Sequence, residues 1–550
     1  MKIETAWVKP PRQIRGLDHL AVQAPCINVY GRLLPGITNV TDRARYYSFY
    51  PWLIWAFDRR GWTRYDDKFV ERFRRADCLF SMISLRHALV SGGDYNDHAR
   101  AMIGSDTLGP VVRELKSSTS LTISDYSKRT GAKARYFANK LGGLGQYYLG
   151  VLRELAILSG DSRSGLKYTR QRGQLIAERL DHGFEGKVFM DIVEADNLST
   201  RDLDDLKSLC PCHLQENREE ADILRDLFFA RGIFQDSEAM PRRRSLQSII
   251  QLSDLLVAEG SELTEDTFRA CAYSRALPSG TPWEAPGSLI TNRERWATYA
   301  RNELLSLAVQ GLFFALLDAY EESGLRLDSS DDIVDWFLRQ PETLGAIKEL
   351  GGNKNYKQLV EDSESWLSIL TNWTSSEHEV QMTERIVELC RGPRSADCRQ
   401  QIILFGIRAL IALGARRTAG HFGYANLDFE EGYFRYYPIN LRSFEYRATQ
   451  DWVLLAGTEL LRWILLHWGI EVHLRVALRK LRGQSQSTYR IRPSDQGFEV
   501  VGVPPATHTS PRFDQAVGIL KDIGALVRSE SGTWVSSELG REIIEQGDVA

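Results

Sequence analysis

Residues 291–324, TNRERWATYARNELLSLAVQGLFFALLDAYEESG, carry the clearest structural pattern in the sequence. Apolar residues recur at spacings of three and four from Trp296 to Ala315, which is typical of a helix that buries one face. Thr291 and Glu294 have the spacing of a capping box, and Gly324 is typical of a helix end. The stretch therefore predicts one helix of about eight turns. We expect it to form the spine of a central helical domain.

Similar patterns along the rest of the chain predict a mainly α, multi-domain protein with a small α+β domain at the C-terminus. The other expected helices cover residues 42–60, 70–90, 164–180, 218–229, 246–258, 331–338, 357–370, 383–390, 395–415 and 451–481.

Three Gly-, Ser- and Pro-rich stretches, at 159–165, 277–287 and 483–488, read as linkers. They divide the chain into an N-terminal helical module with an aromatic and basic motif (1–160), a second helical segment (161–287), a central helical domain (288–483) and a winged-helix-like domain (484–550).

The C-terminal residues predict a specific order of elements. Strands at 489–492 and 498–501 flank a turn, and a helix opened by Ser510 and Pro511 ends at Gly524. A second hairpin at 525–536 and a short last helix follow. Helix, two-stranded wing and helix resemble the second half of a winged helix. The 67 residues from Gln484 hold six basic and nine acidic side chains, so docking to a protein is as plausible as reading DNA.

Composition limits the broad class. The 550 residues are 43% hydrophobic and 26% charged, with a formal net charge of −3, as in an ordinary globular protein. Any contact with nucleic acid must therefore come from local basic patches. The seven scattered cysteines predict reduced thiols rather than a disulfide framework. With no apolar run resembling a signal peptide at the N-terminus, the expected setting is the cytoplasm, with no membrane partner.

Three basic patches are candidate nucleic-acid contacts. The first lies on a predicted helix, the second is a triplet at a helix start, and the third is interleaved with aromatic residues that could stack on bases. For the third, a buried aromatic face beside a solvated basic edge is the simpler interpretation. The candidates are Arg475, Arg479, Lys480 and Arg482; Arg242, Arg243 and Arg244; and Arg43 and Arg45.

Metal and catalytic motifs are weak. Cys210, Cys212 and His213 bring three possible metal ligands together, but structural zinc normally takes a fourth ligand from a second pair, and no such pair is visible. We therefore expect no metal and no cofactor. No phosphate-binding loop or nucleophile elbow is present, so no catalytic residue is assigned. The Asp191/Glu194 and His421/Glu430 neighbourhoods keep a divergent metal-dependent nuclease open as an alternative.

The N-terminal motif carries the one resemblance to a known group. Pro35-Gly36, the Thr-containing step 38–41, Arg43-Ala-Arg-Tyr46 and Pro51-Trp52 resemble the start of uncharacterised, largely helical bacterial proteins found in anti-phage defence islands. The resemblance covers roughly the first sixty residues. It implies a subunit of a multi-protein defence system, encoded beside helicases and nucleases, and it supplies no catalytic residue.

These observations lead to three hypotheses. The first is a non-enzymatic subunit of a bacterial anti-phage defence complex that contacts nucleic-acid phosphates, with DNA as the expected form, through its basic patches. The second is an interaction scaffold that docks a helicase or nuclease without touching DNA. The third is the divergent nuclease.

Overall fold

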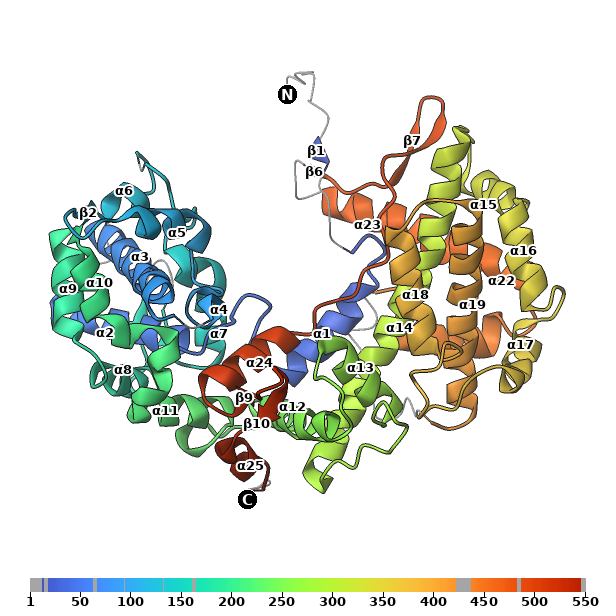
Figure 1. The fold of residues 1–550 in the computed structure, drawn as a ribbon. Helices are drawn as coiled ribbons and strands as arrows, with labels where there is room; N and C mark the ends of the chain where they lie inside the picture. Colours follow the sequence, from blue (N-terminus) through green and yellow to red (C-terminus); the bar gives the residue numbers. More distant parts are fainter. Residues whose placement is uncertain are drawn as a thin grey trace. The chain divides into compact units, whose positions relative to one another are not determined.

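The computed structural model describes residues 12–13, 18–62, 67–92, 94–131, 133–160, 165–421, 437–481 and 486–545. Helices dominate these residues, so the predicted mainly α class is confirmed (Figure 1). The strands are short, and within the described ranges they pair only in twos.

The chain folds into two compact units, each assembled from several stretches of sequence. Unit 1 comprises residues 1–30, 266–284 and 293–511, and unit 2 comprises residues 31–265, 285–292 and 512–550. This division differs from the four consecutive segments expected above, because the chain leaves unit 2 and returns to it twice. The helices α1 (Gln23–Leu33), α13 (Glu265–Ser274) and α14 (Gly287–Ser323) have residues in both units.

Unit 2 is built around two helices rich in aromatic and apolar residues. Every residue of α2 from Tyr46 to Phe57 is buried, and α3 packs against α4, α5, α9 and α10 (Figure 1). Phe49 stacks on Phe80 with ring centroids 4.2 Å apart. The helices of unit 2 are α2 (Tyr46–Arg59), α3 (Asp67–Val90), α4 (Tyr95–Ala99), α5 (Ser105–Glu114), α6 (Ser124–Ser127), α7 (Leu149–Glu154), α8 (Gly173–Asp181), α9 (Gly186–Ala195), α10 (Thr200–Asp205), α11 (Arg218–Phe228), α12 (Met240–Ala258), α24 (Phe513–Asp522) and α25 (Glu538–Glu545), with the 3-10 turns η2 (Lys207–Leu209), η3 (Pro211–Glu216) and η4 (Gly232–Phe234) and the π-helical turn η1 (Leu144–Tyr148).

Unit 1 packs its helices around α14 and α19. Gly406 of α19 allows a close approach to α14, since a Cβ there would lie 2.9 Å from the Leu312 side chain. Around them α16, α17 and α18 cover α19 (Figure 1). The helices are α15 (Ser330–Leu338), α16 (Pro341–Leu350), α17 (Tyr356–Asp362), α18 (Glu379–Arg391), α19 (Ala396–Thr418), α21 (Leu441–Tyr446), α22 (Gly457–Trp463) and α23 (Glu471–Leu481), with the 3-10 turn η5 (Ser363–Ser365) and the π-helical turns η7 (Arg447–Asp451) and η8 (Ile464–Ile470).

The long helix predicted at 291–324 is present, but it starts earlier than the capping box indicates. It runs over Gly287–Ser323, and Gly324 follows it with a positive φ of 64°. Thr291 thus lies in the second turn and cannot be the N-cap. The added turn buries Leu289, which is 2% exposed. Burial of this side chain outweighs the local capping signal.

The strands form two-stranded pairs. The elements predicted from 489 onward are present, but they divide between the units. The hairpin β7–β8 belongs to unit 1, whereas α24, β9, β10 and α25 belong to unit 2. Ser510 does not cap α24, because the N-cap is Arg512 with a φ of 63° and no side-chain cap. The strands are β1 (Arg12–Gln13) with β6 (Gln486–Ser487), β2 (Leu121–Thr122) with β5 (Asn197–Leu198), β3 (Leu158–Ser159) with β4 (Lys167–Tyr168), β7 (Ile491–Ser494) with β8 (Gly497–Val500), and β9 (Leu526–Arg528) with β10 (Trp534–Ser536).

Among the described residues, two helices are long and apolar enough to cross a membrane by length and composition alone. They cover Leu289–Ser323 and Ala396–Thr418, and the most apolar windows are 94% and 67% buried inside the structure. Core helices of proteins outside membranes have the same length and composition. These two helices therefore do not decide whether the chain crosses a membrane.

Candidate functional site

Helix α23 carries the first predicted basic patch and is anchored by a fully buried histidine. The Nε2 atom of His473 accepts a hydrogen bond from the Arg490 backbone N–H at 2.8 Å. Its Nδ1–H therefore donates to the His19 carbonyl oxygen, 3.2 Å away. Burial lowers the pKa of His473 to about 4. The ring is a neutral, fixed connector between α23 and two neighbouring segments of unit 1.

The outward face of α23 presents two of the predicted arginines. Arg475 and Arg479 lie one turn apart and are exposed, and neither has a polar partner within the described ranges. Lys480 is half-buried and donates from Nζ to the Asp18 carbonyl oxygen at 2.7 Å. Burial, with Arg479 and Arg490 nearby, lowers the pKa of Lys480 despite Asp18. Arg482 lies outside the described residues. Of the described residues of this patch, Arg475 and Arg479 thus supply the available charge.

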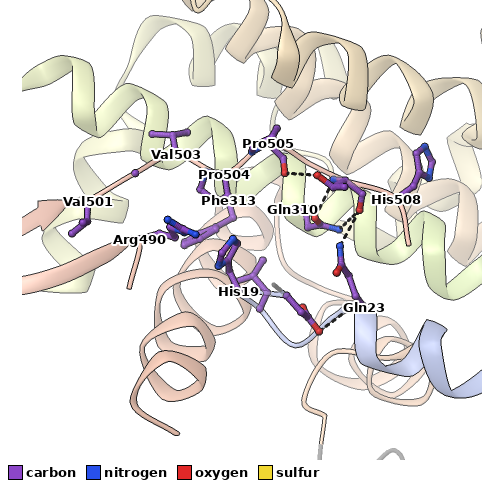
Figure 2. Close-up of a pocket in the computed structure, with 14 residues that line it drawn as sticks. His19, Gln23, Gln310, Phe313, Arg490, Val501, Val503, Pro504, Pro505 and His508 are labelled. Carbon is purple, nitrogen blue, oxygen red and sulfur yellow. Dashed lines mark hydrogen bonds between the residues drawn. The ribbon is translucent and has the colours of Figure 1, made fainter. Parts of the chain in front are cut away.

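A cavity of about 680 Å³ is lined by His19 and Arg490, the two residues whose backbone groups bond to His473 of this helix. Figure 2 shows His19 and Arg490 on one side of it, Phe313 behind them, and Gln23 and Gln310 at the far end. This volume is in the range of small-molecule pockets. His19 is also neutral, because burial lowers its pKa to about 3. Since His473 bonds to both His19 and Arg490, the cavity and α23 form one continuous region of unit 1.

The polar groups at the far end of the cavity form hydrogen bonds with one another. Gln310 accepts from the Thr507 N–H at 3.2 Å and donates to the Thr507 carbonyl at 3.3 Å, and Gln23 donates to the same carbonyl at 3.1 Å (Figure 2). Just beyond, His508 lies 3.3 Å from Glu303 and 3.0 Å from Glu384. Burial opposes its charge, but these two carboxylates raise the pKa of His508 to about 9. This end of the cavity is therefore a rigid wall.

The neutral histidines make the stability of unit 1 depend on pH. The folded pKa of His473 lies below the unfolded value of 6.5, so its contribution is present above pH 6.5 and is lost as the pH falls towards 4. We expect His473 to account for a loss of about 2 kcal/mol between pH 6.5 and pH 5. Hydrogen exchange of α23 peptides, corrected for intrinsic rates, measures the local unfolding free energy at each pH.

Two variants separate this titration from general destabilisation. His473→Gln removes the ionisable group, and the pH slope of α23 protection should flatten by about 1.4 kcal/mol per pH unit. His508→Gln is the control, because a folded pKa of about 9 keeps His508 charged in the folded state over this range, and its loss should change the acid slope far less. If His473→Gln keeps the wild-type pH slope of α23 protection, this account of His473 is contradicted.

The other two basic patches are buried in unit 2. Arg45 pairs with Glu220 at 2.6 Å, and Arg43 pairs with Asp522 at 3.0 Å. Arg242 is also buried and donates to the carbonyl oxygens of Leu227 and Phe228 at 2.7 and 3.1 Å.

Burial changes the interpretation of these patches. Arg242 satisfies the last carbonyls of α11, which explains an arginine at a helix start that the helix dipole disfavours. Arg243 is buried and Arg244 half-buried. Phosphate would have to displace the intramolecular partners of Arg43, Arg45 and Arg242, so we do not include these patches in an interface. The simpler interpretation of the third patch is right about the buried aromatic face, which describes α2, but wrong about a solvated basic edge at Arg43 and Arg45, which are buried.

The carboxylates considered for a nuclease do not form an open acidic pair. Asp191 and Glu194 both lie on helix α9. Arg60 lies 2.5 Å from Asp191 and 3.6 Å from Glu194. An arginine thus occupies the position that a metal ion would need. Glu430 lies outside the described residues, so the His421/Glu430 neighbourhood cannot be assembled.

A group of four potential metal ligands lies in unit 2. The sequence pointed to only two of them. Cys210 and Cys212 meet His87 and His98, and one ligand atom from each lies within 4.8 Å of all the others. The sequence predicted no metal because no second pair of ligands was visible in it. His87 and His98 form that pair, more than 110 positions earlier in the chain, and no local spacing connects them to the cysteines.

Comparison with known proteins adds no further constraint: no family model, no curated protein and no solved structure matches the chain.

Proposed function

We propose that this protein is a non-enzymatic, cytoplasmic subunit that contacts nucleic-acid phosphates through the outer face of α23. The observation that carries the proposal is the pair Arg475 and Arg479, exposed one turn apart on a helix held in place by His473 and Lys480. Arginines in this arrangement hold phosphates without reading sequence. The adjoining cavity adds Arg490 and Phe313 to the same region.

The setting follows from the N-terminal resemblance. The motif at 35–52 supports membership of a bacterial anti-phage defence complex with a helicase or nuclease as partner. In such a complex this subunit supplies nucleic-acid contact and the partner supplies catalysis. DNA is the expected form, contacted mainly along its backbone.

A second candidate function is docking of a protein partner through the C-terminal part of unit 2. There α24, β9, β10 and α25 have the order of the second half of a winged helix. The basic residues of α24 bond within the chain, because Arg512 donates to the Leu34 carbonyl at 3.0 Å and Lys521 pairs with Asp97. Seven of the ten residues of α24 are buried, which favours a docking role for the β9–β10 hairpin over DNA reading by α24.

The double variant Arg475→Ala/Arg479→Ala tests the proposed function. We expect affinity for short DNA at low salt to fall about tenfold, equally for all sequences, because two phosphate contacts are lost. Fluorescence anisotropy with labelled single-stranded and duplex DNA of equal length measures the loss and shows which form is bound.

The control removes the same charge elsewhere on unit 1. Arg326 and Arg391 are exposed residues outside α23, and Arg326→Ala/Arg391→Ala should change affinity far less. Equal losses in the two double variants would show only a general effect of net charge. If the intact protein binds neither form of DNA at low salt, the docking function is the better account.

A further inference from the structure

The end of α3, the helix α4 and the turn η3 bring two histidines and two cysteines together in unit 2. The Sγ atom of Cys210 lies 3.5 Å from His98 Nδ1, and the Sγ atom of Cys212 lies 3.3 Å from His87 Nδ1. In a tetrahedral zinc site with Zn–S of about 2.3 Å and Zn–N of about 2.0–2.1 Å, ligand atoms lie about 3.3–3.8 Å apart. These two sulfur–nitrogen distances therefore have the dimensions of a zinc site.

The other nitrogen of each histidine ring has its own partner. His98 Nε2 lies 2.9 Å from the Ser91 hydroxyl, and the Nε2–H tautomer, which donates there, has Nδ1 free to bind a metal. His87 Nε2 lies 3.5 Å from His213 Nε2, and His213 Nδ1 lies 2.7 Å from Glu216. Such outer partners fix the tautomer and orientation of metal-binding histidines.

The cysteine side of the cluster is held by a buried arginine. Arg45 donates from Nη1 to the carbonyl oxygens of Ser208 and Cys210, at 2.7 and 2.5 Å. Cys210 is completely buried, whereas Cys212 is accessible to solvent. The ligands are therefore positioned by the fold of unit 2, and a metal ion has a route to them.

We propose that His87, His98, Cys210 and Cys212 bind one zinc ion as a structural Cys₂His₂ site. Four protein ligands complete a tetrahedral shell and leave no position for substrate, which distinguishes a structural from a catalytic zinc. The ion would tie His87 and His98 to the turn at 210–212, across more than one hundred residues of chain. The proposal is independent of the nucleic-acid contact proposed for α23 of unit 1.

The first test is the metal content of the full-length protein, purified without a metal-affinity step and measured by inductively coupled plasma mass spectrometry. We expect one zinc per chain. Cys210→Ser and His98→Gln should each reduce the zinc content at least tenfold, whereas Cys398→Ser, which changes a cysteine of unit 1, should retain it. Zinc absent from the wild type, or unchanged in both site variants, would overturn the proposal.

A second measurement does not depend on whether the variants fold. Wild-type protein stripped by a chelator and refilled with Co²⁺ should show the visible absorption of tetrahedral cobalt and a thiolate charge-transfer band, and it should lose both on addition of Zn²⁺. A colourless protein, or a Cys210–Cys212 disulfide in the freshly isolated chain, would contradict a metal site here.

Discussion

Glu220→Ala is expected to destabilise unit 2 by about 3–5 kcal/mol, the cost of leaving one charge of a buried ion pair without its partner. Glu220 is 0% exposed and Arg45 is 1% exposed. The carboxylate accepts from Arg45 and also from the Ser48 hydroxyl at 2.6 Å. Its removal leaves the buried guanidinium uncompensated in the middle of the aromatic core.

Chemical denaturation of the variant, with hydrogen exchange of peptides from α2 and α11, measures this loss. The control is Glu219→Ala, on the same turn, where a solvent-screened carboxylate pairs with Arg179 and should contribute little to stability. Glu220→Gln keeps a hydrogen-bond acceptor and should lie between the two. If Glu220→Ala behaves like Glu219→Ala, the buried pair does not hold unit 2 together.

Asp522→Ala is also expected to destabilise unit 2 by about 3–5 kcal/mol, because it leaves the buried charge of Arg43 without its partner. Asp522 is buried at the end of α24, where its Oδ2 accepts from Arg43 Nε at 3.0 Å and from the Ala44 backbone N–H at 2.9 Å. The pair joins the C-terminal segment to the start of the N-terminal motif. We therefore expect α24 and α25 to lose hydrogen-exchange protection together with α2.

The exposed Asp514 on the same helix provides the matched control. Asp514→Ala removes the same charge from α24 and should change stability by less than about 0.5 kcal/mol. If Asp522→Ala frees α24 and α25 while α2 keeps its protection, the C-terminal elements form an independent domain rather than a part of unit 2.

Local patterns in the sequence predicted most helices. They did not predict where the chain leaves one unit and returns to the other. The repeat of apolar residues from Trp296 to Ala315 required a helix, and α14 contains it. The C-terminal strands and helix were also predicted, because turn residues mark their ends. Their division between two units depends on contacts such as Arg43 with Asp522, separated by 479 positions. No local pattern contains such a contact.

The candidate sites also depend on contacts between distant residues, which local sequence patterns do not show. Arg43, Arg45 and Arg242 looked like phosphate ligands, because a sequence does not show that a buried carboxylate or a helix end lies opposite each of them. Arg475 and Arg479 remain predicted contacts, since amphipathic spacing on α23 already placed them outward. The zinc cluster was half visible at Cys210 and Cys212. Its other half, His87 and His98, has no motif spacing and becomes evident only when α3 and α4 meet η3.

The salt dependence of DNA binding tests the central claim most directly. For the intact protein and for Arg475→Ala/Arg479→Ala, the logarithm of the association constant is measured against the logarithm of the salt concentration. Each phosphate contact contributes about 0.7–0.9 to the slope, so the double variant should show a slope lower by about 1.4–1.8 than the intact protein. Identical slopes would show that α23 does not touch the phosphate backbone, and the proposed function would be contradicted.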